Sequence, residues 1–209
     1  MQRNRKNLRV TRLLQKELSR SDTVLDLGCG PSSLLQYVKG PTKTVGVEYW
    51  NPSIEESRQR EIHTEYINAD ITTVNYPDSS FDSVILIDVL EHFTKEDAVK
   101  LLSTIQRWAK KNVIIVVPNG FIPQDEDDEE GNKKQHHLSG WSVRDLEGMG
   151  FRVKGFGGLR YLRGERAQII PTRTLFGHYF LAGLSKISEP VTDIFPQYSY
   201  HLFAVWERK

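Results

Sequence analysis

The stretch VLDLGCGPSS, residues Val24–Ser33, joins a short apolar run to a glycine-rich turn, and leucine-rich sequence of helical character follows it. The apolar run has the length and composition of a buried β-strand. Gly28 and Gly30 can adopt positive φ angles, and without a Cβ they let backbone N–H groups approach a ligand. This succession of strand, turn and helix therefore predicts an α/β protein with a nucleotide-type binding loop after its first strand.

Around this unit the chain alternates short apolar runs with segments of helical periodicity, which is typical of a sheet covered by helices on both faces. The clearest helix begins after Thr94, and its apolar side chains recur at three- and four-residue steps as far as Trp108. The apolar runs predict strands at 23–27, 44–48, 66–68, 83–87, 112–117, 151–154 and 200–207.

Length and composition indicate one domain over residues 1–209. A net charge of +1, from 28 Lys+Arg against 27 Asp+Glu, excludes a strongly basic nucleic-acid coat and an acidic disordered tail. The single cysteine permits neither an internal disulfide nor a cysteine cluster, so we expect a reducing, cytoplasmic compartment and no bound metal. No apolar run approaches the length of a spanning helix and the N-terminus is polar, so neither membrane insertion nor secretion is expected.

Three segments stand apart from the regular alternation. Residues 1–20 combine basic side chains with leucines at helical spacing, which predicts an N-terminal amphipathic helix. Residues 121–140 contain six consecutive acids at 125–130, which we interpret as a solvated loop, with a cation or basic-partner site as the alternative. Residues 156–197 are rich in aromatic side chains and form an insert before the last strand.

An acidic residue, Glu48, ends the second predicted strand. A carboxylate at this place can accept hydrogen bonds from both hydroxyls of a ribose. Because Glu48 follows the glycine loop at the distance expected for the next strand end, the two features together predict a nucleoside-binding site.

Taken in order, VLDLGCGPSS and VGVEYW (45–50) resemble the first two motifs of the class I S-adenosylmethionine-dependent methyltransferases, in particular the small-molecule type 11 group. NADI (68–71) is similar to the third motif and FDSVILIDVLEHF (81–93) to the fourth, so the resemblance covers residues 20–155 and, more loosely, the last strand. It implies a Rossmann-like, doubly wound, seven-stranded sheet, mostly parallel with an antiparallel last strand, and S-adenosyl-L-methionine as the cofactor. The cofactor-binding residues that it implies are Asp26, Gly28, Cys29, Gly30, Glu48, Tyr49, Asp70, Ile71 and Asp88.

The resemblance also implies individual roles. Asp70 is expected to meet the adenine amino group, Ile71 to contact the adenine ring, and Asp88 to lie beneath the methionine part of the cofactor. Cys29, inside the glycine loop, is expected to be a small packing residue and not a nucleophile.

A dinucleotide is the competing cofactor. Its loop requires a third glycine where Ser33 stands, and the Asp26 carboxylate is awkward beside a diphosphate but suits the cationic methionine end of S-adenosylmethionine. The methyltransferase loop commonly has a third glycine where this chain has Ser32, so the geometry of the loop departs here from the family pattern.

Methyl transfer from a sulfonium requires alignment of the acceptor lone pair and exclusion of water, and it needs no metal. A histidine is a suitable general base for a hydroxyl or ammonium acceptor. HHLSGWSVRDLEGMGFRV (136–153) resembles a family stretch in which a histidine precedes an aromatic–Ser pair, so we assign the base to His137, with His92 second. A structural or surface histidine is the alternative for each.

The predicted acceptor is a small molecule, apolar or linked to a sugar or lipid. DNA is not expected, because the only cysteine lies in the cofactor loop and DVLEHF (88–93) replaces the Asn/Asp-Pro-Pro-aromatic motif of adenine enzymes. An RNA or protein methyltransferase and a non-catalytic methyltransferase-like binding protein are the alternatives. The insert at 156–197 is expected to cover the acceptor, and residues 174–195 are a candidate contact with a second copy or a membrane surface.

Overall fold

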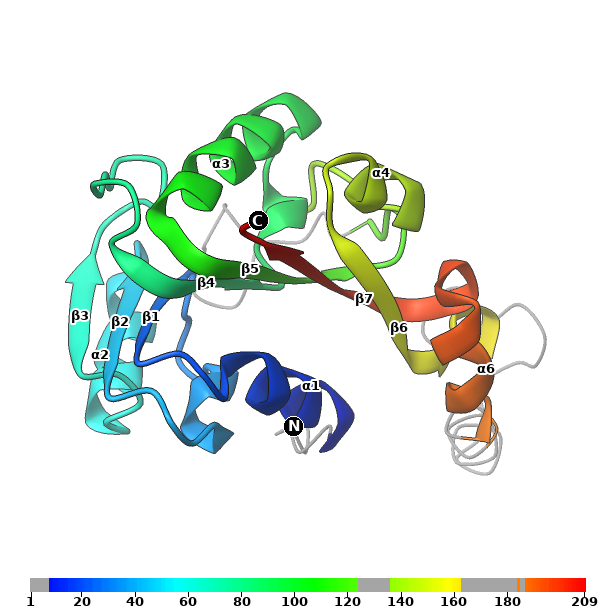
Figure 1. Ribbon diagram of the computed structural model, residues 1–209, viewed down its shortest axis with the longest axis horizontal. Helices are drawn as coiled ribbons and strands as arrows, with labels where there is room; N and C mark the ends of the chain where they lie inside the picture. The colour runs from blue at the N-terminus through cyan, green and yellow to red at the C-terminus, as the bar shows by residue number, and fades with distance from the viewer. Residues whose placement is uncertain (1–7, 124–135, 163–183, 185–186) are drawn as a thin grey trace.

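The computed structural model describes residues 8–123, 136–162, 184 and 187–209. Within these residues one sheet has the strand order β3-β2-β1-β4-β5-β7-β6 (Figure 1). Its first five strands pair in parallel, and the last strand of the chain runs antiparallel to both of its neighbours. The strands are β1 (Thr23–Leu27), β2 (Lys43–Glu48), β3 (Glu65–Asn68), β4 (Phe81–Ile87), β5 (Ala109–Pro118), β6 (Arg152–Leu159) and β7 (Ser199–Glu207). The predicted Rossmann-like, mostly parallel sheet is confirmed.

Helices cover both faces of this sheet, because alternate residues of the central strands point into two separate cores. Leu25 and Val84 pack with α3 (Lys95–Trp108) and α4 (Val143–Gly148), whereas Val24 and Ile85 pack with α1 (Leu8–Leu18) and the 3-10 turn η1 (Leu34–Tyr37). Figure 1 shows α3 and α4 on one side of the sheet and α1 on the other. The short helices α2 (Asn51–Gln59) and α6 (Glu189–Ile194) pack against β2 and β6.

Two elements differ most from the sequence-based prediction. The helix after the glycine loop is only the turn η1, whose first backbone N–H groups are capped by the Ser33 hydroxyl at 3.2 Å from Leu35 N. The sixth strand continues beyond the predicted 151–154 to Leu159. Gly155 explains this extension, because a Cβ there would lie 2.4 Å from the Thr192 carbonyl oxygen, so only glycine lets α6 pack directly on the strand.

Several predicted segments fall partly outside the described residues. Residues 1–7 of the N-terminal helix do so, and α1 is its described part. The acidic run 125–130 and residues 163–183 of the insert lie outside as well, as does much of the 174–195 contact candidate. No helix among the described residues is long and apolar enough to cross a membrane. The described ends of the insert include the 3-10 turns η4 (Arg160–Leu162) and η6 (Pro196–Tyr198).

The strand order brings the predicted site residues to one edge of the sheet. Because β1 lies between β2 and β4, the connections that leave β1 and β4 run in opposite directions across the sheet. At such a switch point the loops diverge, and open α/β sheets bind ligands in the crevice outside the carboxyl ends of the strands. The glycine loop, Glu48, Asp70 and Asp88 all follow carboxyl ends of neighbouring parallel strands.

Candidate functional site

The glycine loop is held to the next strand by backbone hydrogen bonds. The N–H groups of Gly28 and Cys29 donate to the Val47 carbonyl oxygen at 2.8 and 3.1 Å. Gly28 has φ +70°, and a Cβ there would lie 2.5 Å from Cγ2 of Val89, so the segment after β4 packs directly on the loop. Gly30 has φ +56°, and a Cβ built on it would meet no atom within 4 Å. The loop is therefore closed on the Val89 side and open at Gly30.

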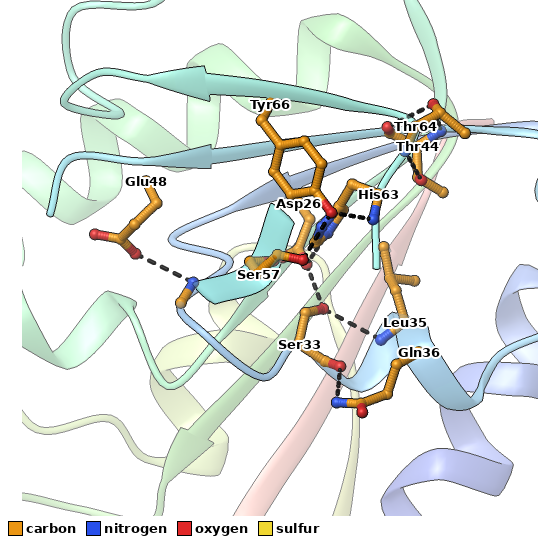
Figure 2. A network of polar contacts seen from close by, with 11 residues as sticks. Asp26, Ser33, Leu35, Gln36, Thr44, Glu48, Ser57, His63, Thr64 and Tyr66 are labelled. Carbon is orange, nitrogen blue, oxygen red and sulfur yellow. Dashed lines mark hydrogen bonds and ion pairs between the residues drawn. The ribbon is translucent and has the colours of Figure 1, made fainter. Parts of the chain in front are cut away.

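Glu48 turns its carboxylate toward this open part of the loop (Figure 2). Its Oε2 accepts a hydrogen bond from Gly30 N at 3.1 Å, and its Oε1 accepts one from Trp50 N at 2.9 Å. The residue is 8% exposed, and burial raises the pKa of its carboxyl, although the two backbone N–H donors oppose that rise. Each carboxylate oxygen has a second lone pair, so Glu48 retains the capacity to accept hydrogen bonds from a ligand's hydroxyls.

Asp26 points beneath the loop, into the layer between sheet and helices (Figure 2). It is 2% exposed, its Oδ2 accepts a hydrogen bond from the Ser33 hydroxyl, and the same oxygen lies 2.9 Å from Nε2 of His63. Asp26 thus fixes the loop to η1, and its contact with the methionine end of a cofactor stays a prediction. Ser33 stands where a dinucleotide-binding loop has a glycine, and its hydroxyl makes the hydrogen bond to Asp26.

Sequence reasoning did not single out His63 as the partner of Asp26. The backbone N–H of His63 donates to Tyr66 Oη at 2.8 Å, and that hydroxyl donates to the Ser57 carbonyl at 2.9 Å (Figure 2). A Cβ on Gly46 would lie 3.0 Å from both the His63 ring and Cys29 Sγ, so the glycine of the VGVE motif makes room for them. Gly46, two positions before Glu48, was the feature of the sequence that could have indicated a side chain packed here.

Cys29 is buried against Gly46. Burial, followed by the charges of Asp26 and Glu48, raises the pKa of its thiol far above the ordinary value. A thiol held in the neutral form is a poor nucleophile, which agrees with a packing role.

The remaining predicted cofactor residues lie along the same edge. Asp70 orders the turn after β3, because its Oδ1 accepts from both the backbone N–H and the hydroxyl of Thr72, at 2.9 and 2.7 Å. The side chain of Ile71 belongs to the main core, which leaves its backbone for contact with a ligand. Asn68, which sequence reasoning missed, donates to the carbonyl oxygens of Glu48 and Tyr49 at 2.9 and 3.0 Å and so fixes the segment after β2.

Asp88, the residue directly after β4, has a strained backbone conformation. Its φ is +54°, and its N–H donates to the Val116 carbonyl oxygen at 2.9 Å. A non-glycine residue in this region costs about 1–3 kcal/mol, and such residues cluster at functional sites. The strained residue leads directly into Val89 and the 3-10 turn η2 (Leu90–His92).

The structure brings the two candidate histidines together. The rings of His92 and His137 are edge to face with their centroids 5.0 Å apart. Nδ1 of His137 lies 2.7 Å from the Ile122 carbonyl oxygen, and Nδ1 of His92 lies 3.2 Å from that of His136. A carbonyl oxygen only accepts, so in these bonds Nδ1 carries the hydrogen and Nε2 is the nitrogen with a lone pair.

Glu91 completes this cluster, although sequence reasoning gave it no role. It is 3% exposed, and one candidate ligand atom from each of Glu91, His92 and His137 lies within 4.8 Å of the others. Burial, with the charge of Asp88 as the second cause, raises the pKa of Glu91 well above its usual range. Its position next to His92 in DVLEHF was the signal available, but only the fold places His137 beside both.

The family model described as a methyltransferase domain matches residues 25–117 of this chain. Among curated proteins, (S)-coclaurine N-methyltransferase of Thalictrum flavum subsp. glaucum is 33% identical over 122 residues, which are 51% of this chain and 33% of that protein. The probable tRNA methyltransferase 9B of Homo sapiens is 30% identical over 115 residues, 54% of this chain and 23% of that protein. The chain thus spans a third or less of the length of these two relatives.

Solved structures agree on the fold. The crystal structure of an S-adenosylmethionine-dependent methyltransferase from Mesorhizobium loti superimposes with a TM-score of 0.62, over 98% of this chain and 99% of that one. The sequence identity of the pair is 16%, so this likeness concerns the arrangement of strands and helices.

Proposed function

The chain belongs to the class I S-adenosylmethionine-dependent methyltransferases, and from this premise we propose that it transfers a methyl group from S-adenosyl-L-methionine to an oxygen, nitrogen or carbon atom of a small-molecule acceptor. The observation that carries the proposal is the carboxylate of Glu48 beside the open backbone of Gly30. This pairing fits an adenosyl group, because the carboxylate can accept from the ribose hydroxyls while the loop admits the ligand without a Cβ in the way.

Each predicted cofactor residue then has a place along the sheet edge. Glu48 binds the ribose, Asp70 and the backbone of Ile71 face the adenine, and Asp88 lies under the methionine part. Asp26 acts one layer deeper, since it holds the loop through Ser33 and His63. When bound, S-adenosylmethionine supplies an electrophilic methyl group on a sulfonium, and the chain has to orient the acceptor and exclude water.

The histidine pair lies on the acceptor side of this site. Residue Val89, which packs on Gly28, is three positions before His92, so the pair adjoins the loop that holds the donor. In the metal-free protein His137 takes the proton of a hydroxyl or ammonium acceptor at Nε2, while Ile122 fixes the ring through Nδ1. His92 packs against the ring and restricts its orientation.

A small-molecule acceptor is supported by the similarity to a relative named for N-methylation of coclaurine. An RNA acceptor is the second candidate, because another relative is named as a probable tRNA methyltransferase. The segments outside residues 25–117 are proposed to choose between acceptors, since the family match does not cover them.

Transfer of a labelled methyl group tests the proposal. The protein and methyl-labelled S-adenosylmethionine are incubated in three separate reactions, one with a metabolite extract, one with total tRNA and one with a protein extract. We expect label in the metabolite fraction and its loss in Glu48→Ala. Label only in tRNA or protein contradicts the small-molecule acceptor, and no label in any fraction despite donor binding contradicts the catalytic function.

A further inference from the structure

We propose that Glu91, His92 and His137 form a binding site for a divalent transition-metal ion such as Zn²⁺. The inference rests on the proposed function, because it assigns the cation to the acceptor side of the same active site. From the sequence we expect a reaction without a metal. In the proposed site the acceptor oxygen instead binds the cation.

The donor set is the first argument. Two imidazoles and one carboxylate are a recurrent ligand set for Zn²⁺ and Fe²⁺, and they leave coordination positions open for a substrate. One candidate atom from each residue lies within 4.8 Å of the others. Ligands about 2.1 Å from a tetrahedral ion are about 3.4 Å apart, so small side-chain rotations close the set around a cation.

The second argument is an unpartnered buried oxygen. Among the described residues, Oε2 of Glu91 has no hydrogen-bond partner, although Glu91 is 3% exposed. A buried polar atom without a partner costs about 1–3 kcal/mol, and the great majority of such atoms are satisfied by protein, water or an ion. A cation between this carboxylate and the histidines satisfies the oxygen.

The third argument is the rigidity of the supporting groups. The Nδ1 atoms of His137 and His92 are held by the carbonyl oxygens of Ile122 and His136, which directs the Nε2 lone pairs away from these bonds. This is the outer-shell contact that metal-ligating histidines almost always make.

Backbone hydrogen bonds join the two parts of the site. The carbonyl oxygen of Glu91 accepts from the N–H groups of Leu138 and Ser139, at 2.8 and 3.0 Å. These bonds fix the strand-end segment that bears Glu91 and His92 to the segment that bears His137. The three ligands are therefore preorganised across a large separation in sequence.

The position of the site gives the cation a role. A Lewis acid beside the donor loop binds an acceptor oxygen and lowers the pKa of its hydroxyl. The acceptor proton leaves to solvent, the oxygen lone pair forms the new O–CH₃ bond, and the S–CH₃ bond breaks to leave a neutral thioether. In the metal-bound protein His137 is a ligand and not the base, so the acceptor class becomes a hydroxyl-bearing molecule.

Calorimetric titration of the full chain with Zn²⁺ tests the site, with Co²⁺ absorption as a spectroscopic check and Mg²⁺ as the probe that should not bind. We expect one Zn²⁺ per chain. Affinity should fall at least about 100-fold in Glu91→Gln and in His137→Ala, while Glu147→Gln, the same change at an exposed acid on α4, should bind as wild type does. Glu91→Gln preserves the shape of the buried side chain, so it keeps the test valid where the alanine variant fails to fold.

Binding of S-adenosylhomocysteine to the same samples separates this inference from the proposed function. Saturable S-adenosylhomocysteine binding without Zn²⁺ binding overturns the metal site alone. Zn²⁺ binding that persists in both Glu91→Gln and His137→Ala, or that Glu147→Gln abolishes, also overturns it. Absence of S-adenosylhomocysteine binding contradicts the proposed function and leaves the Zn²⁺ result to be judged independently.

Discussion

The proposed donor side of the site, formed by Gly28–Gly30 and Glu48, and the proposed acceptor side, formed by Glu91, His92 and His137, are built in different ways. On the donor side, the glycine loop bonds to the strand that comes next in the chain, through Val47 and Glu48. On the acceptor side, Glu91 is bonded to Leu138, and the ring of His92 meets that of His137 edge to face, across a large separation in sequence. The donor side is therefore a succession of local units, whereas the acceptor side exists only when β4 and β5 have paired.

This difference explains why the donor side can be described in terms of ordered motifs and the acceptor side cannot. It also makes the two sides separable by mutation, because they consist of different residues and meet through the contact between Val89 and Gly28. Changes at the donor side should alter cofactor affinity, and changes at the acceptor side should alter turnover at unchanged cofactor affinity.

The largest expected effect is on the acceptor side. His137→Ala removes Nε2 from the acceptor, and we expect kcat to fall by about 10²–10⁴-fold, as for loss of a general base. The affinity for S-adenosylhomocysteine should stay within about twofold, because the described contacts of His137 are with Ile122 and His92. Turnover close to that of wild type would contradict the acceptor role, and Glu147→Ala, at an exposed acid on α4, serves as the control.

The next effect is on the donor side. Gly28→Ala places a Cβ at 2.5 Å from Val89 in a residue with φ +70°, and the positive φ alone costs about 1–2 kcal/mol. We expect a lower melting temperature and a loss of S-adenosylhomocysteine affinity. Gly148→Ala is the matched control, because a Cβ in α4 meets no atom within 4 Å. Equal melting temperatures and equal S-adenosylhomocysteine affinities in Gly28→Ala and Gly148→Ala would contradict the role assigned to Gly28.

A smaller effect is expected away from both sides, at the amino ends of β1 and β4. Burial alone would raise the pKa of Asp82, but the N–H groups of Asp22 and Thr23 and the ammonium of Lys111 outweigh it and hold that pKa below its usual value. Because the folded pKa lies below the unfolded one, the stabilisation is present above the unfolded pKa, about 4, and is lost as the pH falls through the folded value.

Asp82→Asn should therefore lower the free energy of unfolding by about 1 kcal/mol at pH 7, and this difference from wild type should shrink below about pH 4. Urea unfolding at several pH values measures it. A difference that is the same at pH 3 and pH 7 would contradict the assigned hydrogen bonds. Cofactor affinity and turnover should change little, since Asp82 lies at the opposite end of the strands.

The strands and the donor motifs were predictable because short-range patterns encode them. Buried strands such as β4 and β5 read as continuous apolar runs, and Glu48 follows directly from the end of its strand. Asp26 was recognised as a loop residue, but its partner His63 was not, because only the space left by Gly46 brings them together.

The acceptor side was only partly predictable for the same reason. His92 and His137 lie in separate motifs, and nothing local in the sequence indicates that their rings meet. The role of Glu91 depends on burial and on Asp88, which are properties of the folded protein. The extension of β6 to Leu159 likewise depends on α6 packing over Gly155.

The most direct test of the donor site is calorimetric titration with S-adenosylhomocysteine of wild type, Glu48→Ala and the control Glu147→Ala, an exposed acid on α4. Two hydrogen bonds to a carboxylate are worth about 1.5–3 kcal/mol each, so we predict one saturable site in wild type and an affinity at least about 100-fold lower in Glu48→Ala. Glu147→Ala should match wild type. Absence of binding in wild type, or equal affinity in wild type and Glu48→Ala, would contradict the placement of the donor at Glu48 and the glycine loop.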